Sequence, residues 1–369
     1  MPSRLPPFEL ELGRAATLPA FAYTDPAILE AEKERIFRRS WQPVGSTYDL
    51  REPGSFFTAE IVGAPIVVTR DASGVLHGFY NVCRHRAGPV AVGKGMRRSL
   101  TCRYHGWTYG LDGRLVTTPE LGDVKDFDRS CNGLRPVRVE AWGPLVLACL
   151  DENAPPLLRV LGAIPEESAA HDLASMRPVA RRDYEIACNW KVYVDNFLEG
   201  YHLPTVHPGL YRELDYSKYR VDTFATYSAQ IAPIRPVAAA SEGTRGSRHY
   251  TPSEEGLDAL YYWVFPAWML NIYPDNMSLN VVVPLGPDRC LTIFEWYRKD
   301  PDAPGTAEAI ARTIAFSDGI QLEDIGICES VQKGLRSGGY DRGRFSTTRE
   351  NGVHHFQSLV HAALTRSEA

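Results

Sequence analysis

Hydrophobic residues recur with two different spacings along the chain. The segment AILEAEKERIFRR has helical spacing and follows Asp25 and Pro26, so a helix with proline at its first position is predicted to end near Arg39. Residues 41–152 instead contain short runs rich in β-branched and aromatic residues, separated by turn sequences such as Asp112-Gly113. This range is therefore predicted to form a small all-β module.

The second half of the chain mixes the two spacings. Its pattern predicts helices at 189–202 and 307–336, with strands near 223–232, 261–273, 277–284 and 290–298. One long helix beside several strands is typical of an α+β domain in which the helix packs on an antiparallel sheet. Adjacent prolines at 155 and 156 indicate a linker between the two modules.

Charge and composition exclude several classes of protein. The chain has 40 Lys and Arg against 45 Asp and Glu, a net charge of −5 without a long basic run, which argues against binding to nucleic acid or to a charged membrane surface. No apolar stretch reaches the ~20 residues that span a bilayer, and the first residues lack the apolar core of a secretory signal. The 7 cysteines are scattered, so we expect a protein of the reducing cytoplasm.

Two short segments combine cysteine with histidine. Cys83 and His85 end one β-rich run, and Cys102 and His105 end the next. Two thiolates and two imidazoles on neighbouring loops indicate a metal site, and a structural zinc ion needs the same four side chains. Structural zinc modules more often keep like ligands together. One Cys and one His from each loop suit a two-iron cluster in which the thiolates bind one iron and the imidazoles the other.

A second candidate metal site lies where the predicted helix ends. Asp195, Glu199 and His202 are spaced i, i+4 and i+7, which places them on one helical face. Pro204 interrupts the helix, so His202 is expected at its end and His207 on the turn beyond. Two imidazoles at such a corner can converge on one ion, whereas a solvated, salt-bridged face is the alternative interpretation of the helix alone.

The long helix near the C-terminus offers a third ligand for this site. Asp324 falls near the middle of its apolar face, whereas Glu323 falls outside that face or on its margin. A carboxylate directed into a core is costly unless it is paired or binds a metal. With His202 and His207 it would complete the 2-His-1-carboxylate triad of non-haem Fe(II) centres. The alternative is a buried ion pair with an arginine such as Arg336.

These two groups of residues resemble a known family. The segments CRHRAG and CRYHGWTYGLDGRL resemble the Rieske domain of Rieske non-haem iron oxygenases. The segments NWKVYVDNFLEGYHLPTVHPG and QLEDIGICESVQKGLRSGGY resemble their catalytic domain. The EGYH spacing and the ICESVQKGL stretch look most like the branch of choline monooxygenase and of the glycine betaine and carnitine oxygenases, and less like the naphthalene dioxygenase branch.

The resemblance implies a terminal oxygenase (alpha) component with three parts. Residues 41–153 would form an all-β Rieske domain and residues 154–369 a helix-grip catalytic domain, on which an N-terminal segment of residues 1–40 packs. A Rieske [2Fe–2S] cluster would be held by Cys83, Cys102, His85 and His105. A mononuclear Fe(II) would be held by His202, His207 and Asp324.

The same resemblance implies roles for two more residues and for partner proteins. Glu199 would link the Rieske histidine of one subunit to the catalytic histidine of the next, which implies a homotrimer, and Asn196 would lie close to the iron. The chain has no flavin or nicotinamide fingerprint. A separate NAD(P)H-dependent reductase, with a flavin and a plant-type [2Fe–2S] cluster, is therefore implied, with or without a ferredoxin. The chain departs from the family at Ala87, where glycine is usual, and at Arg84, where proline is frequent.

An aromatic run at 261–273 is the candidate substrate wall. Aromatic rings hold a quaternary ammonium by cation–π attraction, but a strand core has the same composition. Alternating residues of one strand face, Trp263, Phe265 and Met269, either line the pocket or fill the sheet. The resemblance favours a small methylated amine or betaine that is hydroxylated or demethylated. The alternative is hydroxylation or O-demethylation of an aromatic compound.

Two other classes of protein share some of these features. A Rieske-type electron carrier has the cluster, but a large second domain with its own triad argues against it. A zinc-stabilised binding protein would use the Cys and His loops only for structure. Zinc is spectroscopically silent, whereas a Rieske cluster is coloured and gives an EPR signal when reduced, so a spectrum separates these classes.

Overall fold

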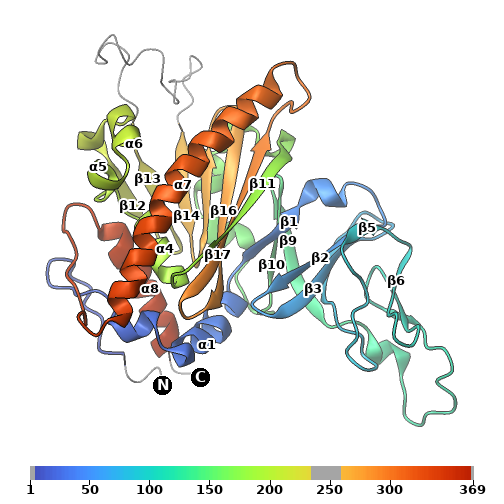
Figure 1. Cartoon of the computed structure of the whole chain (residues 1–369). Helices are drawn as coiled ribbons and strands as arrows, with labels where there is room; N and C mark the ends of the chain where they lie inside the picture. The colour runs from blue at the N-terminus through green and yellow to red at the C-terminus, as the bar shows by residue number, and fades with distance from the viewer. Residues whose placement is uncertain (1–4, 234–258, 367–369) are drawn as a thin grey trace. The chain divides into compact units, whose positions relative to one another are not determined.

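The computed structural model describes residues 5–233 and 259–366, and the chain divides into two compact units (Figure 1). The β unit is Phe37–Leu157, and the α+β unit combines Met1–Ile36 with Leu158–Ala369. Among the described residues, no helix is both long and apolar enough to cross a membrane.

The β unit contains two antiparallel sheets. Seven strands form the larger sheet in the order β1-β10-β9-β4-β3-β2-β5, and β6-β7-β8 form the smaller one. The strands are β1 Gln42–Ser46, β2 Ser55–Ile61, β3 Ala64–Arg70, β4 Leu76–Tyr80, β5 Lys94–Met96, β6 Ser99–Thr101, β7 Thr108–Gly110, β8 Leu115–Thr117, β9 Pro136–Trp142 and β10 Leu145–Cys149. Cys83 and Cys102 lie in a buried cluster with Phe56, Trp107 and Tyr109, so both thiols are part of the core of this unit.

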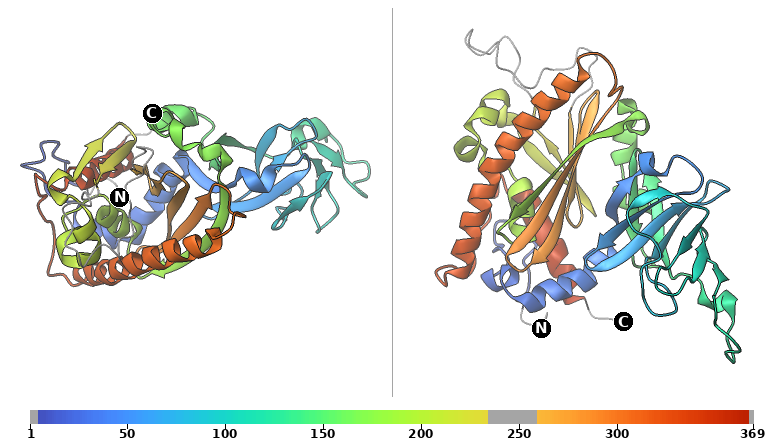
Figure 2. Two further views of the ribbon diagram at one scale, coloured as in Figure 1. Left: turned by 90° about the horizontal axis from the view of Figure 1, so that it is seen from above. Right: turned by 45° about the vertical axis from the view of Figure 1, so that its right-hand side comes forward.

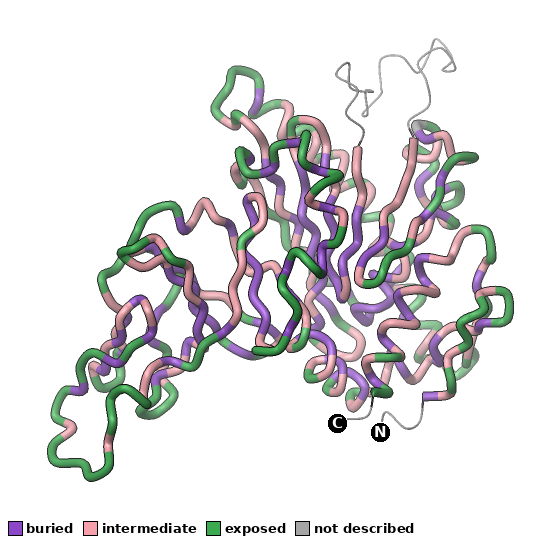
Figure 3. Tube along the Cα trace, turned by 180° about the vertical axis from the view of Figure 1, so that it is seen from behind, coloured by how far each residue is buried: buried purple, intermediate pink, exposed green. Residues whose placement is uncertain are grey.

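The α+β unit is built on one antiparallel sheet with the order β11-β17-β16-β15-β14-β13-β12. Its strands are β11 Arg177–Ile186, β12 Arg220–Thr223, β13 Tyr227–Ile231, β14 Leu260–Val264, β15 Trp268–Ile272, β16 Asn276–Gly286 and β17 Arg289–Arg298. Its helices are α1 Pro26–Arg35, α2 Leu157–Leu161, α3 Ile164–Glu167, α4 Trp190–Phe197, α5 Leu203–Val206, α6 Pro208–Glu213, α7 Thr306–Arg336 and α8 Asn351–Thr365. The central strands are buried over most of their length (Figure 3).

The long helix α7 lies along one face of this sheet, as Figure 1 and the two views of Figure 2 show. Two side-chain contacts attach it to the strands. The Gln321 amide donates to the Thr292 hydroxyl on β17 at 3.1 Å, and the Tyr184 hydroxyl on β11 donates to Asp318. Because both contacts come from one helical face, they orient that face, and with it Asp324, toward the sheet.

A buried ion pair attaches the N-terminal segment to α4. Lys191 Nζ lies 2.6 Å from Glu32 Oε1 with both side chains fully buried, and the Trp190 indole donates to Glu32 Oε2 at 2.7 Å. Burial raises the pKa of Glu32 and lowers the pKa of Lys191, while the attraction between the two groups opposes both shifts. Helix α4, which carries Asn196, is therefore attached to α1 by this ion pair.

The structure corrects two details of the predicted elements. The helix that begins after Asn189 has the predicted cap, since the Asn189 side chain accepts from the Lys191 amide at 3.0 Å, but it ends at Phe197 rather than at residue 202. The aromatic run 261–273 is a hairpin of β14 and β15 rather than one strand. Because a turn separates the two strands, the side-chain alternation does not continue from one to the other.

Removing one partner of the buried pair tests its contribution to stability. In Lys191→Met, the Glu32 carboxyl stays buried with only the Trp190 N–H, so we expect the free energy of unfolding to fall by roughly 3–5 kcal/mol. Scanning calorimetry should show this as a lower unfolding temperature. Arg181→Ala is the matched control, because it removes the ion pairs of a half-exposed arginine with Asp183 and Glu295. A loss of about 1 kcal/mol or less is expected there, and equal losses in the two variants would contradict this interpretation.

Candidate metal centres and substrate cavity

The two Cys and His loops of the β unit have the same backbone geometry. In each, the cysteine carbonyl accepts from the amide four residues on, and the cysteine amide donates to the carbonyl five residues on. These distances are 3.0 and 2.8 Å at Cys83, and 2.9 and 2.9 Å at Cys102. The residue four positions on has a positive φ in both loops, 57° at Ala87 and 73° at Gly106. A left-handed backbone explains why glycine is usual where this chain has Ala87.

The four candidate cluster ligands lie at two depths. Cys83 and Cys102 are each 3% exposed, whereas His85 and His105 are exposed with ring centroids 4.6 Å apart. Burial raises the pKa of the Cys102 thiol, and a negative charge on Cys83 raises it further. Binding to a metal would therefore be needed to keep the two cysteines deprotonated. A Cβ added to Gly88 would lie 3.0 Å from Cys102 Sγ, which shows that the loop backbone passes close to the sulfur.

Neighbouring side chains hold the two loops in shape. The His85 ring stacks on Trp107 with centroids 4.9 Å apart. The Tyr109 hydroxyl accepts from the Arg84 amide at 2.9 Å and lies 3.2 Å from Cys83 Sγ. Two thiols inside and two imidazoles at the surface, on loops of equal geometry, suit the asymmetric ligand set of a Rieske cluster.

In the α+β unit, the chain turns sharply after α4. The Glu199 carboxylate accepts from the amides of Tyr201 and His202, and this local side-chain bonding competes with continuation of the helix. Gly200 is required at the turn, because a Cβ there would lie 2.6 Å from the Tyr219 ring. His202 consequently lies directly before the short helix α5, at its N-cap position. The sequence pattern had instead predicted it at the end of the preceding helix.

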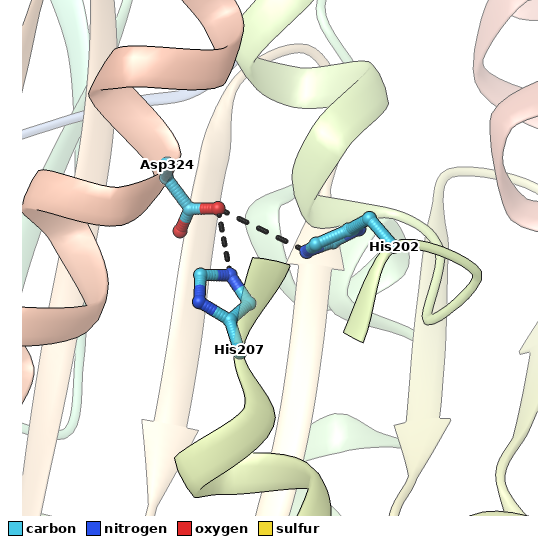
Figure 4. Close-up of side chains that lie close together, drawn as sticks. All are labelled: His202, His207 and Asp324. Atoms are coloured by element: carbon cyan, nitrogen blue, oxygen red, sulfur yellow. Dashed lines mark hydrogen bonds and ion pairs between the residues drawn. The ribbon is translucent and has the colours of Figure 1, made fainter. Parts of the chain in front are cut away.

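Three of the predicted ligands lie together (Figure 4). His202, His207 and Asp324 each present one ligand atom, and these atoms lie within 4.8 Å of one another. Asp324 Oδ1 is 2.9 Å from His207 Nε2 and 3.8 Å from His202 Nε2. Asp324 thus faces the histidines and not Arg336, which pairs with Asp288 at 2.5 Å.

A second carboxylate holds the far nitrogen of each imidazole. Glu199 lies 2.6 Å from Nδ1 of His202, and Glu323 lies 2.6 Å from Nδ1 of His207. Both Nε2 atoms are therefore left to face Asp324, as metal-binding histidines require. Burial lowers the pKa of His207, but the bonds to Asp324 and Glu323 raise it above its ordinary value on balance. The sequence analysis did not identify Glu323 as a residue of this site. Its position next to Asp324 was the signal that could have indicated it.

The remaining polar residues of α4 have separate partners. Asn196 donates to Asp324 Oδ1 at 2.7 Å, so it lies beside the three candidate ligands. Asp195, which the helical spacing had grouped with Glu199, instead accepts from the hydroxyl of Tyr23 at 2.7 Å. Burial raises the pKa of Asp195 to about 7. Asp195 thus belongs to the contact with the N-terminal segment.

A cavity of about 1000 Å³ opens on the triad between α4, α7 and the sheet. The predicted substrate residues Trp263, Phe265 and Met269 do not line it, and Trp263 and Met269 are fully buried in the unit. From the same segment, Tyr261 and Tyr273 line it instead. Aromatic side chains form much of the wall, among them Tyr219, Tyr261, Tyr273, Phe294, Trp296 and Phe316.

Comparisons with known proteins agree with both halves of the molecule. Residues 40–128 match the Rieske [2Fe-2S] domain and residues 173–366 match the ring hydroxylating alpha subunit (catalytic domain). Chloroplastic choline monooxygenase of Arabidopsis thaliana is 37% identical over 96% of this chain and 84% of its own. The carnitine monooxygenase oxygenase subunit of Escherichia coli K12 is 32% identical over 94% of this chain and 93% of its own.

A solved structure gives the same result in three dimensions. The quaternary ammonium Rieske monooxygenase CntA in complex with L-carnitine superposes with a TM-score of 0.83 at 29% identity, covering 97% of this chain and 98% of CntA. The predicted family, fold class and cofactors are thereby confirmed. The chain belongs to the Rieske non-haem iron oxygenases as an alpha component: an O2-using oxidoreductase that carries a Rieske [2Fe–2S] cluster and a mononuclear iron and takes its electrons from a partner reductase.

Proposed function

We propose that this chain is a monooxygenase for a small methylated ammonium compound. The observation that carries the proposal is an aromatic-walled cavity that opens directly on His202, His207 and Asp324. A quaternary ammonium has no N–H to donate, so ring faces are the chemistry that suits it, at about 0.5–2 kcal/mol per good contact. The named substrates of the relatives, choline and carnitine, support this class. Naphthalene 1,2-dioxygenase is similar at only 19% identity and supports the fold alone.

We assign the cofactors to the residues that the geometry favours. Cys83 and Cys102 would bind one iron of the cluster, with His85 and His105 on the other. The mononuclear iron would be held by His202, His207 and Asp324, and it supplies reductive activation of O2 for insertion of one oxygen atom into a C–H bond. Overall, R–H, O2, two electrons and two protons give R–OH and water. Hydroxylation of an N-methyl group gives a carbinolamine, which releases formaldehyde and the demethylated amine.

The protein side chains orient the metal ligands and surround the substrate. Glu199 and Glu323 each accept from an imidazole Nδ1–H and so fix both rings with Nε2 turned inward. Asn196 holds one oxygen of Asp324 and limits its rotation. Aromatic side chains of the sheet line the cavity that opens on the triad, and they would hold the substrate near the metal.

We propose that electrons reach the mononuclear iron through Glu199 from the cluster of a neighbouring subunit in a homotrimer. The Glu199 carboxylate lies 2.6 Å from Nδ1 of His202, and its side chain is 12% exposed. His85 and His105 are exposed on the β unit, as ligands that contact a partner must be. One reported CntA structure is described in terms of inter-subunit electron transfer, which supports this route. The partner reductase would be NAD(P)H-dependent, with a flavin and a plant-type [2Fe–2S] cluster.

A single-turnover experiment tests the substrate class. Holoprotein reduced chemically without O2 is mixed with ¹⁸O2 and choline, L-carnitine, benzoate or vanillate, and the products are analysed by mass spectrometry. We expect one labelled oxygen atom, or stoichiometric formaldehyde, from an ammonium compound and none from the aromatic acids. Oxidation of an aromatic acid with no ammonium compound oxidised would overturn the proposal.

Removing Asp324 tests the assigned triad. Asp324→Ala takes away one of three ligands, so product formation should fall by at least about 1000-fold, beyond the 10–100-fold expected when a partner such as Glu323 is changed to Gln. The EPR spectrum of the reduced cluster should be unchanged. Glu308→Ala, an exposed position in the first turn of the same helix, is the control and should retain activity. Retained product formation in Asp324→Ala would show that the assignment is wrong.

Mixed oligomers test the electron route. Chains with Cys102→Ser lack the cluster and chains with Asp324→Ala lack the iron, so each alone should be inactive. Random mixing in equal amounts should restore roughly a quarter of the wild-type activity, because a site needs its own iron and a cluster from its neighbour. Adding Glu199→Gln to the Cys102→Ser chain should abolish this recovery. No recovery in the first mixture would place electron transfer within one chain.

A further inference from the structure

The two Cys and His loops of the β unit lie in a strongly basic part of the chain. Residues 82–106 include six Lys and Arg residues and no Asp or Glu, although the whole chain has a net charge of −5. All six are exposed, and they are Arg84, Arg86, Lys94, Arg97, Arg98 and Arg103. This much positive charge beside an electron-transfer centre favours contact with a negatively charged partner.

Only one of these six side chains forms an ion pair within the described residues. Lys94 Nζ lies 2.8 Å from Asp49, whereas no ion pair joins any of the five arginines to a described carboxylate. The guanidinium carbon of Arg86 instead lies 5.2 Å from the ring centroid of Tyr104. Exposed guanidinium groups in this state can bind carboxylates of another protein.

A small hollow of about 70 Å³ lies in this basic surface, beside a candidate cluster ligand. Arg97 and Arg103 line it together with Cys102, and none of its described lining residues is acidic. Val92 and Tyr104 line it as well, and they are 68% and 58% exposed. An exposed apolar centre with arginines around it is typical of a protein–protein contact. With Arg86, these residues form the arginine patch, which consists of Arg86, Val92, Arg97, Arg103 and Tyr104.

Protection of a sheet edge accounts for only part of this charge. Strand β5 is an edge strand of the larger sheet, and Lys94 within it and Arg97 beside it discourage pairing with a strand of another molecule. Arg86 and Arg103 lie instead on the two Cys and His loops, where the backbone forms turns and not strands. Their exposed charge therefore needs another explanation, and both residues are next to cluster ligands in the sequence.

The β unit carries acidic residues on a different loop. Residues 120–128 include four Asp and Glu residues against one lysine, and all five are exposed. Phe127 of this loop contacts Trp107, which in turn stacks on His85. Charges of opposite sign thus lie on separate segments around the cluster loops. An acidic protein would be attracted to the arginine patch and repelled by the 120–128 loop, which orients its approach.

The arginine patch and the exposed histidines involve different ligands of the cluster. His85 and His105 are the exposed ligands on the proposed route to Glu199 of a neighbouring subunit. Cys102 is the ligand that lines the hollow, and Tyr104, whose ring stacks on His105 with centroids 3.8 Å apart, marks the boundary between the two regions. A donor at the hollow would deliver its electron on the thiolate side and leave the histidines to the neighbouring subunit.

We propose that the arginine patch is the docking surface for an acidic face of the [2Fe–2S] domain of the partner reductase. This inference rests on the proposed function for the identity of the donor, but not for the substrate. One electron passes from the [2Fe–2S] centre of the reductase, which is oxidised, to the Rieske cluster, which is reduced, and no bond forms or breaks. Opposite charges speed the encounter, while a small contact lets the oxidised donor leave.

An acidic plant-type ferredoxin is the probe, because its cluster is of the class assigned to the reductase. Stopped-flow absorption follows reduction of the oxidised holoprotein by reduced ferredoxin, and calorimetry of the two oxidised proteins gives their dissociation constant. In the wild type we expect the rate constant to fall at least about 10-fold between about 20 and 500 mM NaCl. At low salt, Arg97→Glu should lower the rate constant and raise the dissociation constant, each about 10-fold, and Arg97→Glu with Arg103→Glu should do so further. At high salt these differences should vanish.

Two controls separate docking from net charge and from damage to the cluster. Arg159→Glu with Arg312→Glu makes the same change of charge at exposed positions of the α+β unit and should behave like the wild type. Reduced methyl viologen, a small cation, should reduce the cluster of every variant at least as fast as that of the wild type. A variant that meets this condition has kept its cluster.

Several results would overturn the inference. They are no reaction of ferredoxin with the wild type, rate and dissociation constants of both patch variants within about 2-fold of the wild type, and an equal loss in the control pair. Dissociation of the oligomer in the patch variants, measured by light scattering, would also overturn it, because the patch would then lie between copies of this chain. Chemically reduced holoprotein needs no donor, so its oxidation of ammonium compounds tests the proposed substrate class separately.

Discussion

Three carboxylates converge on two imidazoles beyond the end of α4, and a cation bound between the imidazoles would offset the charge of the carboxylates. Asp324 faces both Nε2 atoms, while Glu199 and Glu323 accept from the Nδ1 sides. Among the ion pairs of the described residues, none joins these carboxylates to Lys or Arg. With neutral imidazoles the half-buried group carries three negative charges, which repel one another. A divalent ion on the inner nitrogens removes most of that repulsion.

The rest of the α+β unit holds these groups in position. The sheet carries α7 through Gln321, and α4 is fixed on its other side by the buried pair of Lys191 with Glu32. The metal ligands lie on turns and a helix face, whereas the opposite wall of the cavity consists of strand side chains such as Asn280 and Trp296. The sheet therefore supplies most of the wall opposite the ligands, while α7 contributes both Asp324 and the wall residue Phe316.

Short sequence windows identified three side chains that lie together in the structure, whereas the residues predicted to line the substrate cavity do not line it. His202 and His207 share one turn, and Asp324 could be found from helical spacing because α7 is regular. Trp263 and Met269 do lie on one sheet face, but which part of that face meets the cavity depends on strand pairing across 261–273, which alternation cannot reveal. The end of α4 was misplaced for a local reason, because the Glu199 side chain takes backbone amides that a longer helix would have used.

The most direct test of the two-centre account is the metal content of the protein purified without O2. Iron, zinc and acid-labile sulfide are quantified per chain, and the absorption and reduced-state EPR spectra are recorded on the same sample. The account predicts about three irons and two sulfides per chain with a Rieske-type spectrum, since one cluster and one mononuclear site are both filled. Zinc in place of iron, or iron without sulfide, would contradict it.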